Sequence, residues 1–192
     1  SANQPIRSPA EFEGVQIRTM DNRLLRETYE AYGADPTPMA YGELYSGLQQ
    51  GVVDAAVQPF FAHEEMGFYE VQDYLISARQ AQFIASFMAS ATFYERLSEE
   101  RRQMLREITA GMVDWAHEMQ QRVHRQRRQA IQQELDTEIV ELDEAQREAF
   151  RDLARPLRAM FASRVGTRGE QALTRLLAAV EAAEAEHGDG DD

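Results

Sequence analysis

Apolar and polar positions alternate at the start of the chain and then repeat at helical spacing. In residues 12–19, FEGVQIRT, Val15 and Ile17 stand on one side and Gln16 and Arg18 on the other. This two-residue period predicts a short strand with a charged residue near its carboxyl end.

Glycines and prolines divide the residues that follow. Residues 22–33 have apolar positions at helical spacing and stop at Gly33, which predicts a helix with a glycine after its last turn. The prolines of 35–39 predict an extended segment, because proline disfavours helical geometry in the residue before it. A second helix is predicted at 41–51 and a mostly buried strand at 52–57. The order strand, helix, extended segment, helix, strand is typical of an α/β fold with a parallel sheet.

The middle of the chain changes from mixed to helical character. The apolar, aromatic run AQFIASFMAS at 81–90 suits a central strand. Residues 98–135 contain no proline and open on a serine followed by acidic residues, a pattern typical of a helix N-terminus. One long helix is therefore predicted here, in which only Gly111 offers a place to bend.

The C-terminal part is predicted to hold a short strand at 137–143 and helices at 144–166 and 168–186. Pro156 is expected to kink or split the first of these helices. The predicted domains are an α/β ligand-binding lobe at 1–97, a long connecting helix at 98–136, a strand with C-terminal helices at 137–187, and an acidic tail at 188–192.

Composition narrows the classes of function. The net charge of −13 and the pI near 4.8 argue against nucleic-acid binding, because an acidic surface repels phosphates. The absence of lysine and cysteine excludes Schiff-base and thiolate chemistry within this chain. No apolar run reaches the roughly 20 residues needed to cross a bilayer. The chain opens on SANQPIRSP without Met, so we expect either a removed signal peptide or a start inside a longer protein.

Three residues are candidates for binding a ligand, because the crevice of an open parallel sheet lies beyond the carboxyl ends of its strands. Arg18 ends the first strand, Tyr41 follows the proline-rich segment, and Gln58 follows the strand at 52–57. Arginine offers a rigid, always-charged fork for a carboxylate, and glutamine adds a neutral hydrogen bond. Structural roles remain open, since Arg18 can pair with a nearby acid and the other two can serve packing.

Other candidate chemistry is weak. The four histidines lack metal-ligand spacing, and no phosphate loop or nucleophile motif is present, so we expect no metal, no cofactor and no catalysis. The basic cluster RVHRQRRQ at 122–129 is either a solvated helix face or a docking patch for an acidic partner. Asp54, Glu64 and Glu65 are not placed together across a cleft by any pattern.

Four segments, in their order and spacing, carry a resemblance to a known family: PIRSPAEFEGVQIRT, GADPTPMAYGELYSGLQQGVVDAAVQP, FYEVQDYL and FYERLSEERRQMLRE. They resemble the solute-binding subunit of tripartite ATP-independent periplasmic (TRAP) transporters, of the DctP type, over nearly the whole chain. The resemblance implies a periplasmic-binding-protein type II-like lobe with a parallel-rich mixed sheet and long C-terminal helices. It further implies that the long helix and the strand near 137–143 cross between two lobes.

The resemblance also implies roles for the three candidates. Arg18 matches the arginine that pairs with the substrate carboxylate, Tyr41 an aromatic position of the pocket, usually Phe, and Gln58 a position usually held by Asn before Pro59. The chain departs from the family where it reads DAAVQP in place of the usual Asp-Gly-Gln-Glu-Asn-Pro, which leaves the identity of the acid open. It also starts where the family's second lobe begins, so the first lobe and a further arginine are missing.

A single lobe cannot enclose a small acid. We expect a fragment of a longer receptor, although a lobe supplied by another chain or a loss of transport binding are the alternatives. The expected function is that of a periplasmic component that binds an organic acid between two lobes and serves the membrane subunits of a TRAP transporter. Apolar surface on the long helix leaves a homodimer or domain swap open. The competing hypothesis is a truncated helical module that self-associates and has a vestigial pocket.

Overall fold

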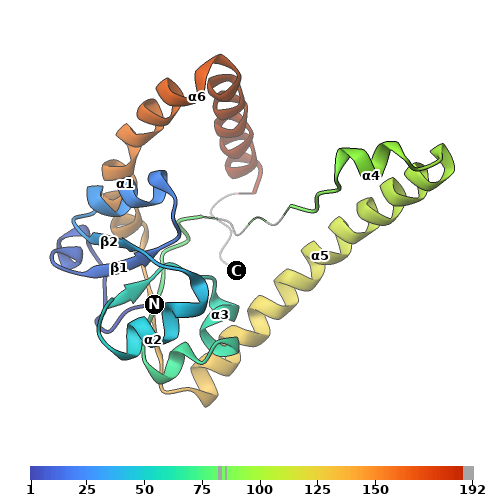
Figure 1. The fold of residues 1–192 in the computed structure, drawn as a ribbon. Helices are drawn as coiled ribbons and strands as arrows, with labels where there is room; N and C mark the ends of the chain where they lie inside the picture. The colour runs from blue at the N-terminus through green and yellow to red at the C-terminus, as the bar shows by residue number, and fades with distance from the viewer. Residues whose placement is uncertain (82–83, 85, 188–192) are drawn as a thin grey trace.

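The computed structural model describes residues 1–81, 84 and 86–187. An α/β body holds the strands, and long helical segments extend from it (Figure 1). The elements in chain order are η1 (Pro9–Phe12), β1 (Gln16–Thr19), α1 (Arg23–Ala31), β2 (Asp35–Pro38), η2 (Tyr41–Glu43), α2 (Leu44–Gln49), β3 (Ala55–Ala56), α3 (Phe60–Glu65), η3 (Phe68–Glu70), β4 (Tyr74–Ser77), α4 (Ala91–Glu95), α5 (Glu99–Glu134), β5 (Glu138–Glu141) and α6 (Glu144–His187).

The strands form a mostly parallel sheet in two parts. β1 lies between β2 and β3, and β4 pairs with β5, all in parallel. Ala2 bridges both Ala55 and Tyr74 in antiparallel fashion and so joins the two parts. Its amide donates to the Tyr74 carbonyl at 3.0 Å. The predicted α/β class with a parallel-rich mixed sheet is confirmed.

Apolar clusters cover both faces of this sheet, because successive residues of a strand point to opposite sides. Ile17 of β1 packs in one cluster with Tyr29 of α1. On the other side, Leu44 and Leu48 of α2 pack with Phe68. The two clusters hold β1 between layers and fix the position of its carboxyl end.

The elements predicted in the first 60 residues are present. The helices at 22–33 and 41–51 are confirmed as α1 and as η2 with α2, and the strands at 12–19 and 52–57 as the shorter β1 and β3. Gly33 follows α1 with a φ of 95°, a left-handed conformation that glycine adopts without strain. The extended segment at 35–39 is a full strand, β2.

The strand predicted at 81–90 is wrong for the residues of that range that the structure describes; residues 82, 83 and 85 lie outside the description. The strand of this region is β4, which finds a partner in β5. Ile84, Phe87 and Met88 stay largely exposed, and an apolar run forms a strand only where a neighbour pairs with its backbone. The predicted acidic tail at 188–192 also lies outside the described residues.

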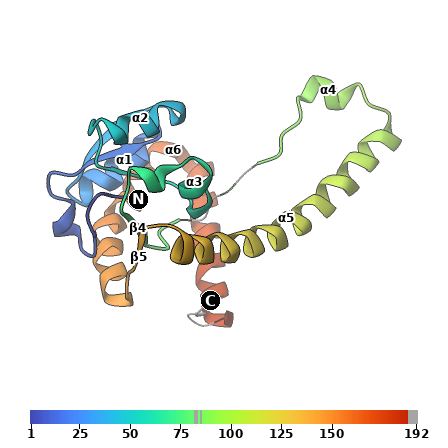
Figure 2. The same ribbon diagram turned by 90° about the horizontal axis from the view of Figure 1, so that it is seen from below.

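α5 is confirmed as one long helix, and the Ser98 hydroxyl accepts a hydrogen bond from the Arg101 amide at 3.4 Å. It runs away from the body, with α4 beside its far end (Figures 1 and 2). Apolar side chains of its first half, among them Met104, Ile108 and Trp115, are exposed. None of the helices described combines the length and hydropathy that a membrane span requires.

The predicted C-terminal strand and helices are present as β5 and α6. Of the kink or split expected at Pro156 in the helix predicted at 144–166, the split is wrong, because the non-helical backbone described inside α6 lies at Gly166, with φ 68° and ψ −179°. Proline fixes φ near a helical value, so a helix can run through it at the loss of a hydrogen bond. Glycine instead reaches the left-handed region that ends a helix.

Candidate functional site

Arg18 lies at the carboxyl end of the central strand β1, beside Thr37 of β2 and Ala56 of β3. The residue is only 4% exposed. Its Nε donates a hydrogen bond to the Met39 carbonyl at 2.9 Å, which fixes the orientation of the guanidinium. The structure therefore places this arginine at the carboxyl end of the parallel strands, where the sequence predicted it.

The charge of Arg18 has no acidic partner among the described residues: no carboxylate there lies within ion-pairing distance. Burial lowers the pKa of the guanidinium, and the coulombic influence of Tyr41 raises it. Arginine nevertheless stays protonated in proteins, so the buried charge persists. A buried, unpaired charge is unfavourable, and an anion brought from outside would relieve that cost.

Tyr41 lies against this guanidinium. The Arg18 Cζ is 5.7 Å from the centroid of the Tyr41 ring, a cation–π distance. The ring also makes an edge contact with Phe68 at 6.1 Å, and it is 42% exposed. Burial raises the pKa of the Tyr41 hydroxyl, with Arg18 lowering it and Glu65 raising it, so the phenol stays neutral near pH 7. Arg18 and Tyr41 together make a cationic and aromatic edge.

Gln58 makes its hydrogen bond outside this pair. Its Nε2 donates to the Ser1 Oγ at 3.1 Å, and its buried Oε1 has no partner among the described residues. Gln58 lines a cavity of about 280 Å³ that neither Arg18 nor Tyr41 lines. The structure thus brings Arg18 and Tyr41 into contact, whereas Gln58 lines a cavity that neither of them lines.

The weaker candidates have structural partners. The Asp54 carboxylate accepts a hydrogen bond from the Gln16 amide at 3.0 Å. In the basic cluster, Arg127 pairs with Glu64, which ties α5 to α3. Arg128 forms an ion pair with Glu141, which joins α5 to β5. Within the described ranges, no group of three His, Asp or Glu side chains is placed to hold a metal ion.

Two contacts of the site were not foreseen from the sequence. The Met39 carbonyl anchors Arg18, and Phe68 supports the Tyr41 ring. Both depend on how loops far apart in sequence meet at the sheet edge. The only signal in the sequence was the position of Met39 at the end of the proline-rich segment.

Comparisons with known proteins agree on one family. The family described as "Bacterial extracellular solute-binding protein, family 7" matches residues 1–164. The ectoine-binding periplasmic protein TeaA of Halomonas elongata is 35% identical over 97% of this chain. The C4-dicarboxylate-binding periplasmic protein DctP of Rhodobacter capsulatus is 28% identical, also over 97% of the chain. A solved structure of the periplasmic ectoine-binding protein from the TeaABC TRAP transporter of H. elongata superposes with a TM-score of 0.90 at 34% identity, covering 95% of this chain.

The matches cover only part of those proteins. The chain spans 55% of TeaA and 54% of DctP, and 60% of the solved ectoine-binding chain. It therefore spans about half the length of the curated relatives it matches.

Proposed function

Because this chain belongs to the bacterial extracellular solute-binding proteins of family 7, we propose that it forms the arginine-bearing lobe of a TRAP-type receptor for an organic carboxylate. One observation carries the proposal: Arg18 is buried at the carboxyl end of the central strand and has no acidic partner among the described residues. A ligand carboxylate at this place would meet a fixed cation.

The geometry suggests how a carboxylate would bind. The Arg18 Nε is occupied by the Met39 carbonyl, so the two terminal nitrogens are left to donate to the ligand. Tyr41 would lie along one side of the bound group, and Gln58 would contribute a neutral hydrogen bond if the ligand extends toward it. A second lobe that binds the same ligand would then shift an open-closed equilibrium by its differential affinity.

The substrate class follows from shared chemistry. The relatives are named for ectoine and for C4-dicarboxylates, and both kinds of ligand carry a carboxylate. The segment DAAVQP offers few polar side chains beyond Gln58. We infer an organic acid held mainly through its carboxylate at Arg18.

We infer binding without catalysis, a periplasmic location and delivery of the acid to TRAP membrane subunits. The relatives are solute-binding proteins, and their names place them in the periplasm. The described site has a cation and an aromatic ring but no paired acid and base beside them. Such a site binds an anion and has no evident means of turning it over.

Titration of the isotopically labelled chain with ectoine and with succinate, followed by ¹H–¹⁵N NMR, tests this function. We expect saturable shifts of the amides at 18, 39–41 and 56–58 in the millimolar range for at least one acid. Arg18→Gln should abolish them, whereas Arg101→Gln, which alters an exposed arginine of α5, should not. Equal shifts in wild type and Arg18→Gln would overturn the role of Arg18.

A further inference from the structure

A cavity of about 280 Å³ lies on the α1 and α6 face of the sheet, opposite the cluster that supports Tyr41. It extends from the ends of β1 and β3 to the first turns of α6 and to residues 78–80. Arg18 does not line it. The proposed carboxylate site therefore leaves this cavity without a function.

The floor of the cavity is aromatic. Tyr29 and Tyr32 of α1 and Phe150 of α6 line it together with Phe12. The Tyr32 and Phe150 rings are 5.1 Å apart and the Phe12 and Tyr29 rings 5.7 Å, both in edge contacts. These rings belong to or pack against the buried core, so the floor is pre-formed and suits an apolar ligand body.

The rim of the cavity is basic, although the chain as a whole is strongly acidic. Its charged side chains are arginines, with no carboxylate among the described lining residues. They are Arg79, Arg147, Arg151, Arg155 and Arg158.

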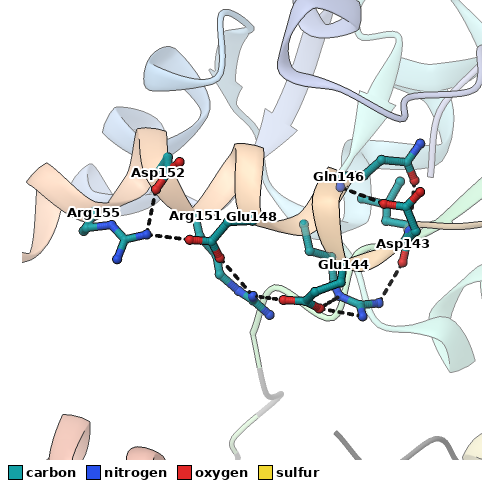
Figure 3. Close-up of polar contacts among 9 residues, drawn as sticks. Asp143, Glu144, Gln146, Glu148, Arg151, Asp152 and Arg155 are labelled. Carbon is teal, nitrogen blue, oxygen red and sulfur yellow. Dashed lines mark hydrogen bonds and ion pairs between the residues drawn. The ribbon is translucent and has the colours of Figure 1, made fainter.

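The arginines at the start of α6 are neutralised by acids of the same helix. Figure 3 shows Glu144, Glu148 and Asp152 alternating with Arg151 and Arg155. Arg155 donates to Glu148 and to Asp152, each at 2.6 Å. These arginines therefore already have acidic partners within the helix.

Two other arginines of the rim are not neutralised. The acids of α6 pair with arginines three or seven residues further on, and for Arg158 those two positions, 155 and 151, are themselves arginines. Neither the Arg158 nor the Arg79 side chain makes an ion pair or hydrogen bond with a described residue. Arg79 also has a φ of 48°, the one left-handed residue other than glycine in the described backbone. Such strain is often found where a side chain is held for a ligand.

One residue of the cavity lining carries a buried polar atom with no partner among the described residues. Gln58 lines the cavity, and its buried Oε1 accepts no hydrogen bond from the described residues. A buried acceptor without a donor is costly, so a water molecule bound to it would be favoured.

We propose that this cavity is a second ligand site, which binds a small monocarboxylate with an aromatic ring or a short hydrocarbon body. The body lies on the rings of Tyr32 and Phe150, and the carboxylate lies between Arg79 and Arg158. Neither Arg18 nor Tyr41 lines this cavity, and Gln58 is the residue that the two proposed sites share. The modest volume excludes large ligands and fits a single ring.

Isothermal titration calorimetry of the full chain with benzoate tests the site, with benzyl alcohol as the neutral analogue and acetate as the carboxylate without a body. We expect saturable benzoate binding and at least tenfold weaker binding of both analogues. Arg158→Gln and Arg79→Gln should each weaken benzoate about fivefold, since exposed ion pairs contribute up to about 1 kcal/mol. Arg175→Gln, an exposed arginine beyond the break of α6, is the matched control and should have no effect.

Arg18→Gln separates this site from the proposed function. If it leaves benzoate affinity unchanged while Arg158→Gln weakens it, the second site stands whatever becomes of the Arg18 site. Loss of benzoate binding in Arg18→Gln alone, or no saturable binding of benzoate at millimolar concentration, would overturn the second site. Equal binding of benzyl alcohol would show that the two arginines do not recognise a charge and would overturn it as well.

Discussion

The Arg18 guanidinium carbon lies 5.7 Å from the centroid of the Tyr41 ring, and the two residues come from different elements, β1 and η2. The exposed ring partly covers a cation that is almost completely buried. Because Tyr41 also rests on Phe68, its ring is held in place before any ligand arrives. A ligand carboxylate would therefore meet a pre-ordered pair and lose little entropy in ordering it.

Substitution of Tyr41 separates the contribution of its ring from that of its hydroxyl. We expect Tyr41→Phe to bind carboxylates as wild type does, because the ring face is kept. Tyr41→Leu should weaken binding about two- to fivefold, the size of an exposed cation–π contact. NMR titration with succinate measures both. If Tyr41→Phe weakens binding as much as Tyr41→Leu, the hydroxyl is the group that contacts the ligand.

Replacing Arg18 with methionine should stabilise the ligand-free chain while removing carboxylate binding. The buried charge has no acidic partner among the described residues, and burial lowers its pKa, so the folded state carries its desolvation cost. We expect the free energy of unfolding in urea to rise by about 1 kcal/mol, after the loss of the hydrogen bond to Met39. Arg101→Met serves as the exposed control. A loss of stability above about 1 kcal/mol in Arg18→Met would mark this cation as structural.

Phe68 and Phe87 give a matched test of which apolar residues form the core. Phe68 is fully buried and packs with Leu44 and Leu48, whereas Phe87 is 74% exposed. Phe68→Ala should reduce the free energy of unfolding by about 3–5 kcal/mol, and Phe87→Ala by less than about 0.5 kcal/mol. Urea denaturation followed by far-UV circular dichroism measures both. A large loss in Phe87→Ala would show that the 81–90 run packs in solution.

The position of Arg18 was predictable because strand parity is local. The alternation in residues 12–19 predicts Ile17 on one face of the strand and Arg18 on the other. In the structure, β1 pairs in parallel with β2 on one side and β3 on the other, which keeps this alternation. β2 was recognised as extended but not as a strand, because proline lacks the amide that a ladder uses. Its place at the sheet edge explains how Pro36 and Pro38 are tolerated.

What could not be predicted depends on contacts between distant segments. The short strand β4 pairs with β5, more than 60 residues away, whereas the apolar pattern of the sequence predicts a strand at 81–90. The cavity likewise combines Arg79 with Arg158 and the aromatic residues of α1. The alternation of acids and arginines in α6 was visible in the sequence, but only the fold shows that it ends beside a cavity.

Two glycines in long helices should respond to alanine with opposite signs. Gly111 lies inside α5 with open space where a Cβ would be, so Gly111→Ala should raise the free energy of unfolding by about 0.5–1 kcal/mol. Gly166 has a φ of 68°, so Gly166→Ala should lower it by about 1 kcal/mol. Thermal and urea denaturation followed by circular dichroism at 222 nm measure both. Changes of the same sign in the two variants would contradict the backbone conformations described here.

His63 should make the stability of the chain depend on pH below 6.5. It is fully buried, its Nε2 lies 3.1 Å from the Thr137 hydroxyl, and its Nδ1 has no partner among the described residues. Burial first, and the positive charge of the Ser1 ammonium second, lower its pKa from 6.5 to about 4. The neutral form is therefore favoured by folding, and a depression of this size corresponds to about 3 kcal/mol.

The sign follows from proton binding. Above pH 6.5 the histidine is neutral in both the folded and the unfolded state, so it adds no pH dependence. Between pH 6.5 and 4 the unfolded state binds the proton and the folded state does not, so stability falls as the pH falls. The advantage of wild type over His63→Gln should thus shrink by up to about 3 kcal/mol from pH 7 to pH 4, measured by urea denaturation at each pH. Because the Ser1 ammonium titrates in both proteins, a gap that stays constant with pH would show that His63 is not the group responsible.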